Sequence, residues 1–490
     1  MERLKNTVQS VRLWLALACG VFPALVSLAN DGNRASSPPK PAAVAMLSLR
    51  VVLDTAALGS TATYAQLGLQ AGPAVQQFYA QRNFAPAWTR PDSGGWNGNA
   101  QQALALLRSA PEFGLDPATY AWPTLLALPD SLRRSTQAAS NLAGFELRLT
   151  DALLRYALHL RYGRLHPTTL LPIPLDKVQT QEAVDRLKLA LTDTLLGPGF
   201  LRCQPASRAY QQLQQAWSKT LRAVPDSLRP STGNAADFRR VALNLERLRW
   251  DASLPDSGDY ALINIPAYQL QLIRAGRVVQ THRVVVGKAA TPTPTLDSRI
   301  AVFVTAPEWR IPYSIAVTEI LPELQNDPGF LAAHNYRLLD YRNRVVNPWR
   351  VNWQRVTPQT FPYTIRQAAG RRNALGNIVF YFANQHGIYV HDTPSRSLFR
   401  EPRRDRSHGC IRVEKPLDLA AFLLKREGQL AALPDMRRSI ATRQKCRYDL
   451  AQGLPIRIRY YTCEAENNRL RYYSDIYCQD ETLAAALFKP

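Results

Sequence analysis

The residues Ile-Tyr-Val-His-Asp-Thr-Pro at 388–394, followed by Arg-Ser-His-Gly-Cys-Ile-Arg at 406–412, decide how the second half of this chain folds. The apolar run that ends at His391 predicts a strand, and Cys410 to Val413 predicts a second, shorter strand. If the two strands pair, they bring a thiol beside an imidazole. A free thiol titrates near pH ~8.5, so it needs a neighbouring base at neutral pH, and imidazole suits that task. The pattern predicts a cysteine nucleophile.

The residues next to the thiol fit acyl chemistry. Gly409 lets another backbone segment approach closely. The N–H groups of Gly409 and Cys410 are expected donors to the oxyanion that forms when a thiolate attacks a carbonyl. One such donor typically stabilises the transition state by ~3–4 kcal/mol. His408 lies two residues before Cys410, so an extended backbone would put both side chains on one side. We expect His408 to orient the substrate or to tune the thiol.

Two other interpretations stay open. His391, His408 and Cys410 could be packing residues, although three polar groups so close in sequence are unfavourable to bury without a purpose. They could also bind zinc, but zinc ligands more often come in Cys-x-x-Cys or His-x3–5-His pairs, and no carboxylate or second cysteine is well placed here. The prediction is an enzyme that uses no metal and no other cofactor.

Length and charge narrow the class of protein. A chain of 490 residues is too long for one ordinary core, so two or three domains are expected. Its 46% hydrophobic and 20% charged residues are typical of a folded protein. The net charge of +22 could suit nucleic acid. The arginines are scattered through apolar segments, however, and no nucleic-acid-binding signature appears. An anionic polymer such as a cell wall, or an acidic peptide substrate, fits at least as well.

The N-terminus predicts export. Basic residues precede an apolar run at 13–29 that ends in Ser27-Leu-Ala29, small residues at the two positions that a signal peptidase recognises. Residues 1–29 are therefore predicted to be a signal peptide, and the polar, proline-rich residues 30–65 a linker. An uncleaved membrane anchor is the alternative. The expected location is the periplasm or cell envelope.

Five cysteines follow this segment, and an odd number in an exported protein leaves at least one thiol free. Cys410 is the candidate, because oxidation would disable it. The pairing of Cys203, Cys446, Cys463 and Cys478 stays open.

The chain reads as a multidomain α + β protein. Residues 66–250 show helical periodicity, as at 146–163, where Gly163 marks the end of a helix. Residues 258–430 predict a mainly β catalytic domain. The segment 313–355 interrupts it, and an insertion of that size is commonly a lid or binding loop. Residues 431–490 predict a C-terminal β extension that packs on the other two domains.

The residues around the thiol resemble the catalytic signature of the L,D-transpeptidases, cysteine enzymes that cross-link bacterial peptidoglycan. That signature is a histidine that ends a strand, a spacer, and then Ser-His-Gly-Cys before an aliphatic residue and arginine. His391 and residues 407–412 match it in full. Further segments resemble the large periplasmic subgroup, which has a helical scaffold domain and a lid: Trp309-Arg-Ile-Pro312, Arg366-Gln367, Gly370, Asn373-Ala-Leu-Gly376, Phe78-Tyr79, Pro86-Ala-Trp88, Gly114-Leu-Asp-Pro117 and Asp475-Ile-Tyr477. Residues 180–235 lack the Phe-Gln-x-x-His-Gly stretch of a small peptidoglycan-binding module found in many relatives.

The resemblance implies a role for each matching residue. Cys410 would be the nucleophile, His391 its proton acceptor and donor, and the backbone carbonyl of Asp392 the group that orients the imidazole. The substrate and oxyanion site would be formed by Ser407, His408, Gly409, Arg412, Asn373, Gly376 and Trp309. Arginines near the site could steer the acidic substrate, but an arginine run is more often a solvated face, and Glu401 and Asp405 partly offset this one. The arginines are Arg396, Arg400, Arg403, Arg404, Arg406 and Arg412.

The implied reaction is acyl transfer between peptidoglycan stem peptides. Cys410 would attack the carbonyl between the third and fourth residues of a tetrapeptide stem and expel D-alanine. An amine on a second stem would then take the acyl group in a 3→3 cross-link, and carbapenems would trap the thiol. Two alternatives remain: an L,D-carboxypeptidase or cysteine peptidase with water as acceptor, and a non-catalytic wall-binding protein.

Overall fold

The computed structural model describes residues 49–51, 61–90, 95–121, 124–126, 138–174, 176–223, 236–251 and 257–488. The predicted signal peptide at 1–29 and most of the predicted linker at 30–65 lie outside these ranges. Within them, no helix is both long enough and apolar enough to cross a membrane.

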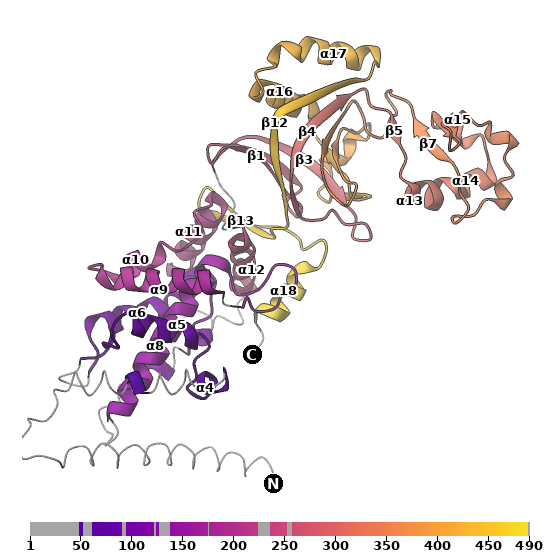
Figure 1. The fold of residues 1–490 in the computed structure, drawn as a ribbon. Coiled ribbons are helices and arrows are strands. Elements are labelled where there is room, and N and C mark those ends of the chain that lie inside the picture. Colours follow the sequence, from indigo (N-terminus) through magenta and orange to yellow (C-terminus); the bar gives the residue numbers. More distant parts are fainter. Residues whose placement is uncertain are drawn as a thin grey trace, which may run out of the picture.

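The chain forms a helical domain followed by a β domain, with a small unit that projects from the side of the β domain away from the helices (Figure 1). This arrangement is the predicted α + β fold class. The helical elements are α4 (Thr61–Gln66), α5 (Gly72–Ala80), α6 (Gly98–Arg108), η1 (Ala110–Phe113), η2 (Pro117–Tyr120), α8 (Ala138–Tyr162), α9 (Lys177–Thr192), α10 (Leu196–Leu201), α11 (Arg208–Arg222) and α12 (Ala236–Trp250).

Helix α8 organises the helical domain. It ends where Gly163 adopts a φ of +86°, a conformation that glycine accepts without strain. Near its start, the buried Glu146 carboxylate accepts hydrogen bonds from the backbone N–H groups of Ala87, Trp88 and Thr89 at 2.9, 2.9 and 2.7 Å. These bonds replace the water that the carboxylate loses on burial, so one acidic residue fixes the loop after α5.

The β domain is a nine-stranded sheet in the order β10-β3-β11-β9-β8-β4-β12-β1-β2, and a further pairing of β2 with β3 closes it on itself. Apolar side chains that alternate along the strands fill its interior. Helix α16 (Pro416–Arg426) contributes Leu419 and Leu423 to the same core. The strands are β1 (Asp259–Asn264), β2 (Gln269–Arg274), β3 (Arg277–Gly287), β4 (Leu296–Thr305), β8 (Ile378–Phe382), β9 (Val390–His391), β10 (Asp405–Ser407), β11 (Ile411–Val413) and β12 (Cys446–Arg459).

The insertion is larger than the predicted 313–355. Strand β7 (Thr364–Gln367) pairs antiparallel with both β5 (Trp309–Arg310) and β6 (Tyr336–Leu339), so the folded unit spans 309–367. It has its own core, which includes Leu324 and Trp353. Its helical elements are α13 (Tyr313–Ile315), the π-helix η4 (Ala316–Ile320), α14 (Leu321–Asn326), α15 (Phe330–Ala333), η5 (Pro348–Arg350) and η6 (Trp353–Arg355).

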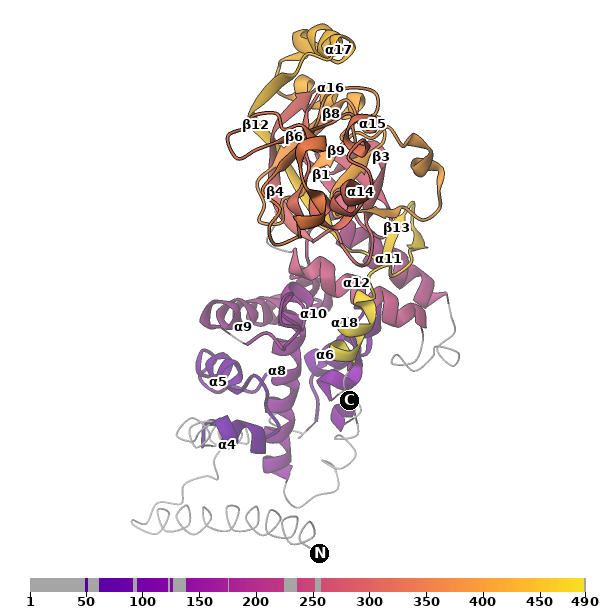
Figure 2. The same ribbon diagram turned by 90° about the vertical axis from the view of Figure 1, so that its right-hand side faces the viewer.

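The C-terminal residues do not form a separate extension. After η8 (Leu430–Ala432) and α17 (Leu433–Thr442), strand β12 lies inside the closed sheet, parallel to β1 and antiparallel to β4. A boundary at 430 would remove a central strand. Only the residues after β12 turn to the helical domain. There β13 (Cys463–Glu466) and β14 (Arg469–Tyr472) form a hairpin against α11 and α12, and α18 (Gln479–Leu487) packs on α12 (Figure 2).

All five cysteines of the described residues carry free thiols: Cys203, Cys410, Cys446, Cys463 and Cys478. Cys463 pairs with Tyr472 across the hairpin, so Cys478 is not its partner there.

Candidate active site

The register of two short strands brings the predicted catalytic residues together. Strands β9 and β11 pair in parallel, with Ile411 opposite Val390 and Arg412 opposite His391. Ile411 and Val390 are buried in the sheet core. Because side chains alternate along a strand, Cys410, Arg412 and His391 lie together on the other face. The predicted pairing of these strands is therefore present.

His391 is held in one tautomer. Its Nδ1 lies 2.6 Å from the backbone oxygen of Asp392, and a carbonyl only accepts, so Nδ1 carries the proton. Burial and the charge of Arg412 lower the pKa of His391 to about 3, although the bond to Asp392 opposes the shift. The ring is therefore neutral at physiological pH, and its Nε2 is an unprotonated base.

The Cys410 thiol is partly buried, and burial raises its pKa above the usual value. Hydrogen bonds from the backbone and side chain of Tyr389, and the charge of Arg412, oppose that shift. The Tyr389 ring also packs edge-on against His391, with centroids 5.5 Å apart. A raised thiol pKa beside a lowered imidazole pKa gives a resting pair of uncharged groups rather than a thiolate–imidazolium pair.

The Asp392 side chain fixes the backbone that orients His391. Its carboxylate is buried, accepts from the Asn377 N–H at 2.8 Å and pairs with Arg396 at 3.1 Å. Gly376 has a φ of +60°, and a Cβ there would lie 2.5 Å from the Asp392 carboxylate. A side chain at position 376 would therefore collide with Asp392, the residue whose carbonyl orients the imidazole.

Ser407 and Thr293 shape the turn before the thiol. The Ser407 hydroxyl accepts from the Gly409 N–H at 3.2 Å and donates to the Cys410 carbonyl at 2.5 Å. Thr293 donates to the Gly409 carbonyl at 2.8 Å. Both N–H groups of this turn were expected to face an oxyanion, but that of Gly409 is used internally. The Cys410 N–H is the remaining candidate.

His408 contacts the insertion. Its Nε2 lies 2.5 Å from the Glu319 carboxylate, which belongs to the π-helix η4. The zinc interpretation needs His391, His408 and Cys410 on one centre, and the described residues contain no cluster of three or more metal-ligating side chains.

Arg412 presents an unused donor beside the thiol. Its Nε is buried and has no hydrogen-bond partner among the described residues. Burial lowers the pKa of this guanidinium, and the nearby Cys410 opposes the shift. Trp309, at the start of the insertion, contacts Tyr389 closely enough to lower its pKa, which burial raises. Arg412 thus lies beside the thiol, and Trp309 lies beside Tyr389, which hydrogen-bonds to that thiol.

The side-chain amide of Asn373 forms its hydrogen bonds with backbone groups. It is 1% exposed, donates to the carbonyls of Pro307, Gln367 and Ala368 at 3.0–3.3 Å, and accepts from the Leu375 N–H at 2.8 Å. It shapes the loop before β8 and is not available for the predicted substrate contact.

Most arginines that were expected to steer the substrate are already engaged. Arg396 pairs with Asp392, Arg403 with Asp405, and Arg406 with Glu401. Arg404 donates to three backbone carbonyls. Of the other two, Arg400 is exposed and Arg412 lies near Cys410, so Arg412 is the member of the set that best fits substrate binding.

Two residues of this region were not predicted. Tyr389 was taken only as an apolar strand residue, yet its place two residues before His391 puts both on one face of an extended segment that ends in β9. That alternation was a usable signal. Glu319 had no such signal, because its contact with His408 depends on how the insertion folds back.

Comparisons with known proteins agree with this architecture. Residues 73–216 match the family model of a scaffold domain, and residues 258–433 match that of an L,D-transpeptidase catalytic domain. A Haemophilus influenzae protein provisionally named an L,D-transpeptidase is 29% identical over 421 residues, which cover 85% of this chain and 80% of that protein.

Two solved structures are also similar to part of the chain. An L,D-transpeptidase from Mycobacterium smegmatis has 14% identity and a TM-score of 0.20, and covers 41% of this chain. L,D-transpeptidase 1 of Mycobacterium tuberculosis has 13% identity, a TM-score of 0.16 and the same coverage. The chain spans about three fifths of each of those structures, 59% and 61%. The chain therefore contains a scaffold domain followed by an L,D-transpeptidase catalytic domain.

Proposed function

We propose that this protein forms 3→3 cross-links in peptidoglycan through a thioester on Cys410. The observation that carries the proposal is the neutral His391 tautomer, with an unprotonated Nε2 on the same sheet face as the thiol. A buried neutral pair needs a base that takes the thiol proton as the sulfur attacks, and His391 Nε2 meets that need.

In the first half-reaction, Cys410 Sγ bonds to the carbonyl carbon of the third stem residue while its proton passes to His391. The Cys410 N–H would stabilise the oxyanion. The C–N bond to D-alanine then breaks, and His391 returns the proton to the leaving amine. The products are free D-alanine and a thioester on Cys410.

In the second half-reaction, the amine of another stem attacks the thioester carbonyl. His391 accepts a proton from that amine and gives it to the departing Cys410 sulfur, so the enzyme regains its starting state. Arg412, with its unpartnered Nε, would bind a carboxylate of the donor stem.

Two family expectations belong to the same proposal. The protein would act at the cell envelope after export, with peptidoglycan stem peptides as both donor and acceptor and with no metal or other cofactor. Carbapenems would acylate Cys410.

The test uses purified wild-type protein and the Cys410→Ala variant with isolated tetrapeptide muropeptides. We expect wild type to give 3→3 dimers and D-alanine in equal amounts, a carbapenem adduct by intact mass, and neither product from Cys410→Ala. Tripeptides without dimers would replace the proposal by a carboxypeptidase with water as acceptor. Dimers from Cys410→Ala, or a wild-type protein without product or adduct, would overturn the cysteine mechanism.

A further inference from the structure

The scaffold domain contains a cavity that none of the catalytic residues touches. It measures about 400 Å³ and lies between the end of α8, the outer face of α9 and the residues after α10. That volume is within the range of pockets that bind small organic groups. Its lining residues are Ala157, Leu158, Arg161, Tyr162, Glu182, Ala183, Asp185, Arg186, Leu189, Arg202 and Cys203.

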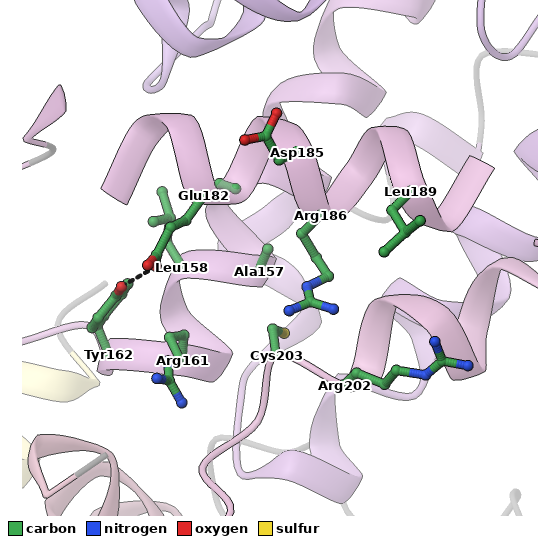
Figure 3. A pocket seen from close by; sticks show the side chains of 11 residues that line it. Ala157, Leu158, Arg161, Tyr162, Glu182, Asp185, Arg186, Leu189, Arg202 and Cys203 are labelled. Atoms are coloured by element: carbon green, nitrogen blue, oxygen red, sulfur yellow. Dashed lines mark hydrogen bonds between the residues drawn. The ribbon is translucent and has the colours of Figure 1, made fainter. Parts of the chain in front are cut away.

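One guanidinium points into this cavity, and two more flank it. Figure 3 shows Arg186 extending from α9 toward Cys203, with Arg161 below it on α8 and Arg202 beside it after α10. Among the residues that the structure describes, none of these three arginines forms an ion pair with an acidic side chain. Arg161 instead lies over the Tyr162 ring, 5.9 Å from its centroid.

The two acids that line the cavity are engaged elsewhere. The Tyr162 hydroxyl donates to Glu182, as the dashed line in Figure 3 marks. Asp185 accepts from the Gln181 amide at 2.8 Å, and its carboxylate points to the opposite side of α9 from Arg186. The lining contains three arginines and two carboxylates, so its net charge is positive.

A second hollow continues the first along α9. It measures about 550 Å³, shares Asp185 and Leu189 with the first, and adds the cations Arg82 and Lys188. The two hollows adjoin at these shared residues, and their combined lining, here called the groove, has five cations and apolar side chains at Ala157, Leu158 and Leu189. Such alternation fits an extended peptide with aliphatic parts and spaced carboxylates better than it fits a compact phosphate.

We propose that this groove binds a carboxylate of an acidic peptide, with Arg186 as its bidentate ligand. The inference rests on the proposed function only for the identity of that peptide, a stem of peptidoglycan. It gives the scaffold domain a binding role, in which it holds one strand of the wall while the β domain acts on another.

The test is titration calorimetry on the full-length Cys410→Ala protein, which cannot turn substrate over. The probes are a tetrapeptide muropeptide, the same muropeptide with its carboxyl groups amidated, and inorganic phosphate. Arg186→Gln is compared with Lys177→Gln, an exposed cation in the first turn of the same helix. Thermal unfolding of each variant checks that it is folded.

We expect Arg186→Gln to weaken one class of muropeptide sites by about tenfold or more, because a charge-assisted pair is lost. Lys177→Gln should bind the muropeptide as tightly as the parent protein does. The amidated muropeptide should not bind to the class of sites that Arg186→Gln weakens. Binding that Arg186→Gln leaves unchanged, no muropeptide binding, or an Arg186-dependent site for phosphate alone would each overturn the inference. If 3→3 dimers fail to form while Arg186-dependent binding persists, the proposed reaction fails and this inference stands.

Discussion

The Glu319 carboxylate of the insertion lies 2.5 Å from Nε2 of His408, two residues before the candidate nucleophile. This contact joins the π-helix η4 to the turn that carries Cys410. π-Helical turns often occur at functional sites, and here the turn meets the site directly. The insertion thus touches the candidate active site both through Trp309 and through Glu319.

Glu319→Ala should loosen the insertion without unfolding the protein. Both side chains are partly exposed, at 36% and 49%, so the pair should contribute no more than about 1 kcal/mol to global stability. We expect an unchanged melting temperature but faster amide hydrogen exchange across residues 313–326. Glu323→Ala, on the exposed side of α14, is the matched control. Equal exchange in both variants would show that the contact does not restrain the insertion.

His391 should make folding stability fall in mild acid. In the unfolded chain its imidazole binds a proton near pH ~6.5, whereas the folded pKa is about 3. Between these values the unfolded state holds more protons, so His391 contributes stability above the unfolded pKa and loses it as pH falls. The loss should approach about 1.4 kcal/mol per pH unit between pH 6 and 4.

Urea unfolding of wild type and His391→Asn at several pH values from 7 to 4 measures this loss. The asparagine amide can still donate to the Asp392 carbonyl but cannot titrate. The difference in unfolding free energy between the two proteins should shrink or reverse as the pH falls. Two curves that stay parallel would mean that the folded imidazole is not held neutral.

The Cys410 thiol should react slowly at neutral pH when substrate is absent. Burial raises its pKa, so its alkylation by iodoacetamide should rise with pH and reach half-maximum above the ordinary value of about 8.5. Tyr389→Phe should move that midpoint higher, because the hydroxyl lowers the pKa of Cys410. Peptide mass mapping separates Cys410 from the exposed Cys478 in the same sample. A midpoint below pH 7 would instead indicate a resting thiolate–imidazolium pair.

The sequence was a good guide wherever a signal was local. Apolar runs located β9, which ends at His391, and β11, predicted as Cys410 to Val413, and the family signature located His391 and Cys410. The error in the domain boundary came from pairing between strands that lie far apart in the sequence. Strand β12 lies more than 140 residues from its neighbours β1 and β4, and nothing within 446–459 indicates which strands it joins. Asn373 shows the same limit, because a polar residue in a matching motif can serve the backbone rather than a ligand.

Gly376→Ala should reduce activity more than an equivalent change at an open site. Its positive φ strains any Cβ-bearing residue, and the new methyl group would also meet the Asp392 carboxylate at 2.5 Å. Gly387→Ala is the matched control, with a φ of +65° and no atom within 4 Å of the added Cβ. Both variants should lose about 1 kcal/mol of stability from backbone strain. Only Gly376→Ala should also lower kcat, since it displaces the backbone that orients His391. Equal kcat values would show that Asp392 absorbs the methyl group without moving its carbonyl.

Arg459→Met should weaken the junction between the two domains. Arg459 ends β12, is 9% exposed, and pairs with Asp251 after α12 at 2.7 Å and with Asp297 of β4 at 2.6 Å. Tyr461 donates to the same Asp251 carboxylate at 2.7 Å.

Removing the Arg459 cation leaves a mostly buried carboxylate that has lost its charge partner, which typically costs about 3–5 kcal/mol. Arg447→Met, on the same strand in the exposed pair with Asp449, should cost much less, because water screens an exposed ion pair. Urea unfolding followed separately by probes in each domain would measure both changes. A single transition in wild type that divides into two in Arg459→Met would show that this arginine couples the scaffold to the catalytic sheet. A loss no larger than that of Arg447→Met would refute the coupling.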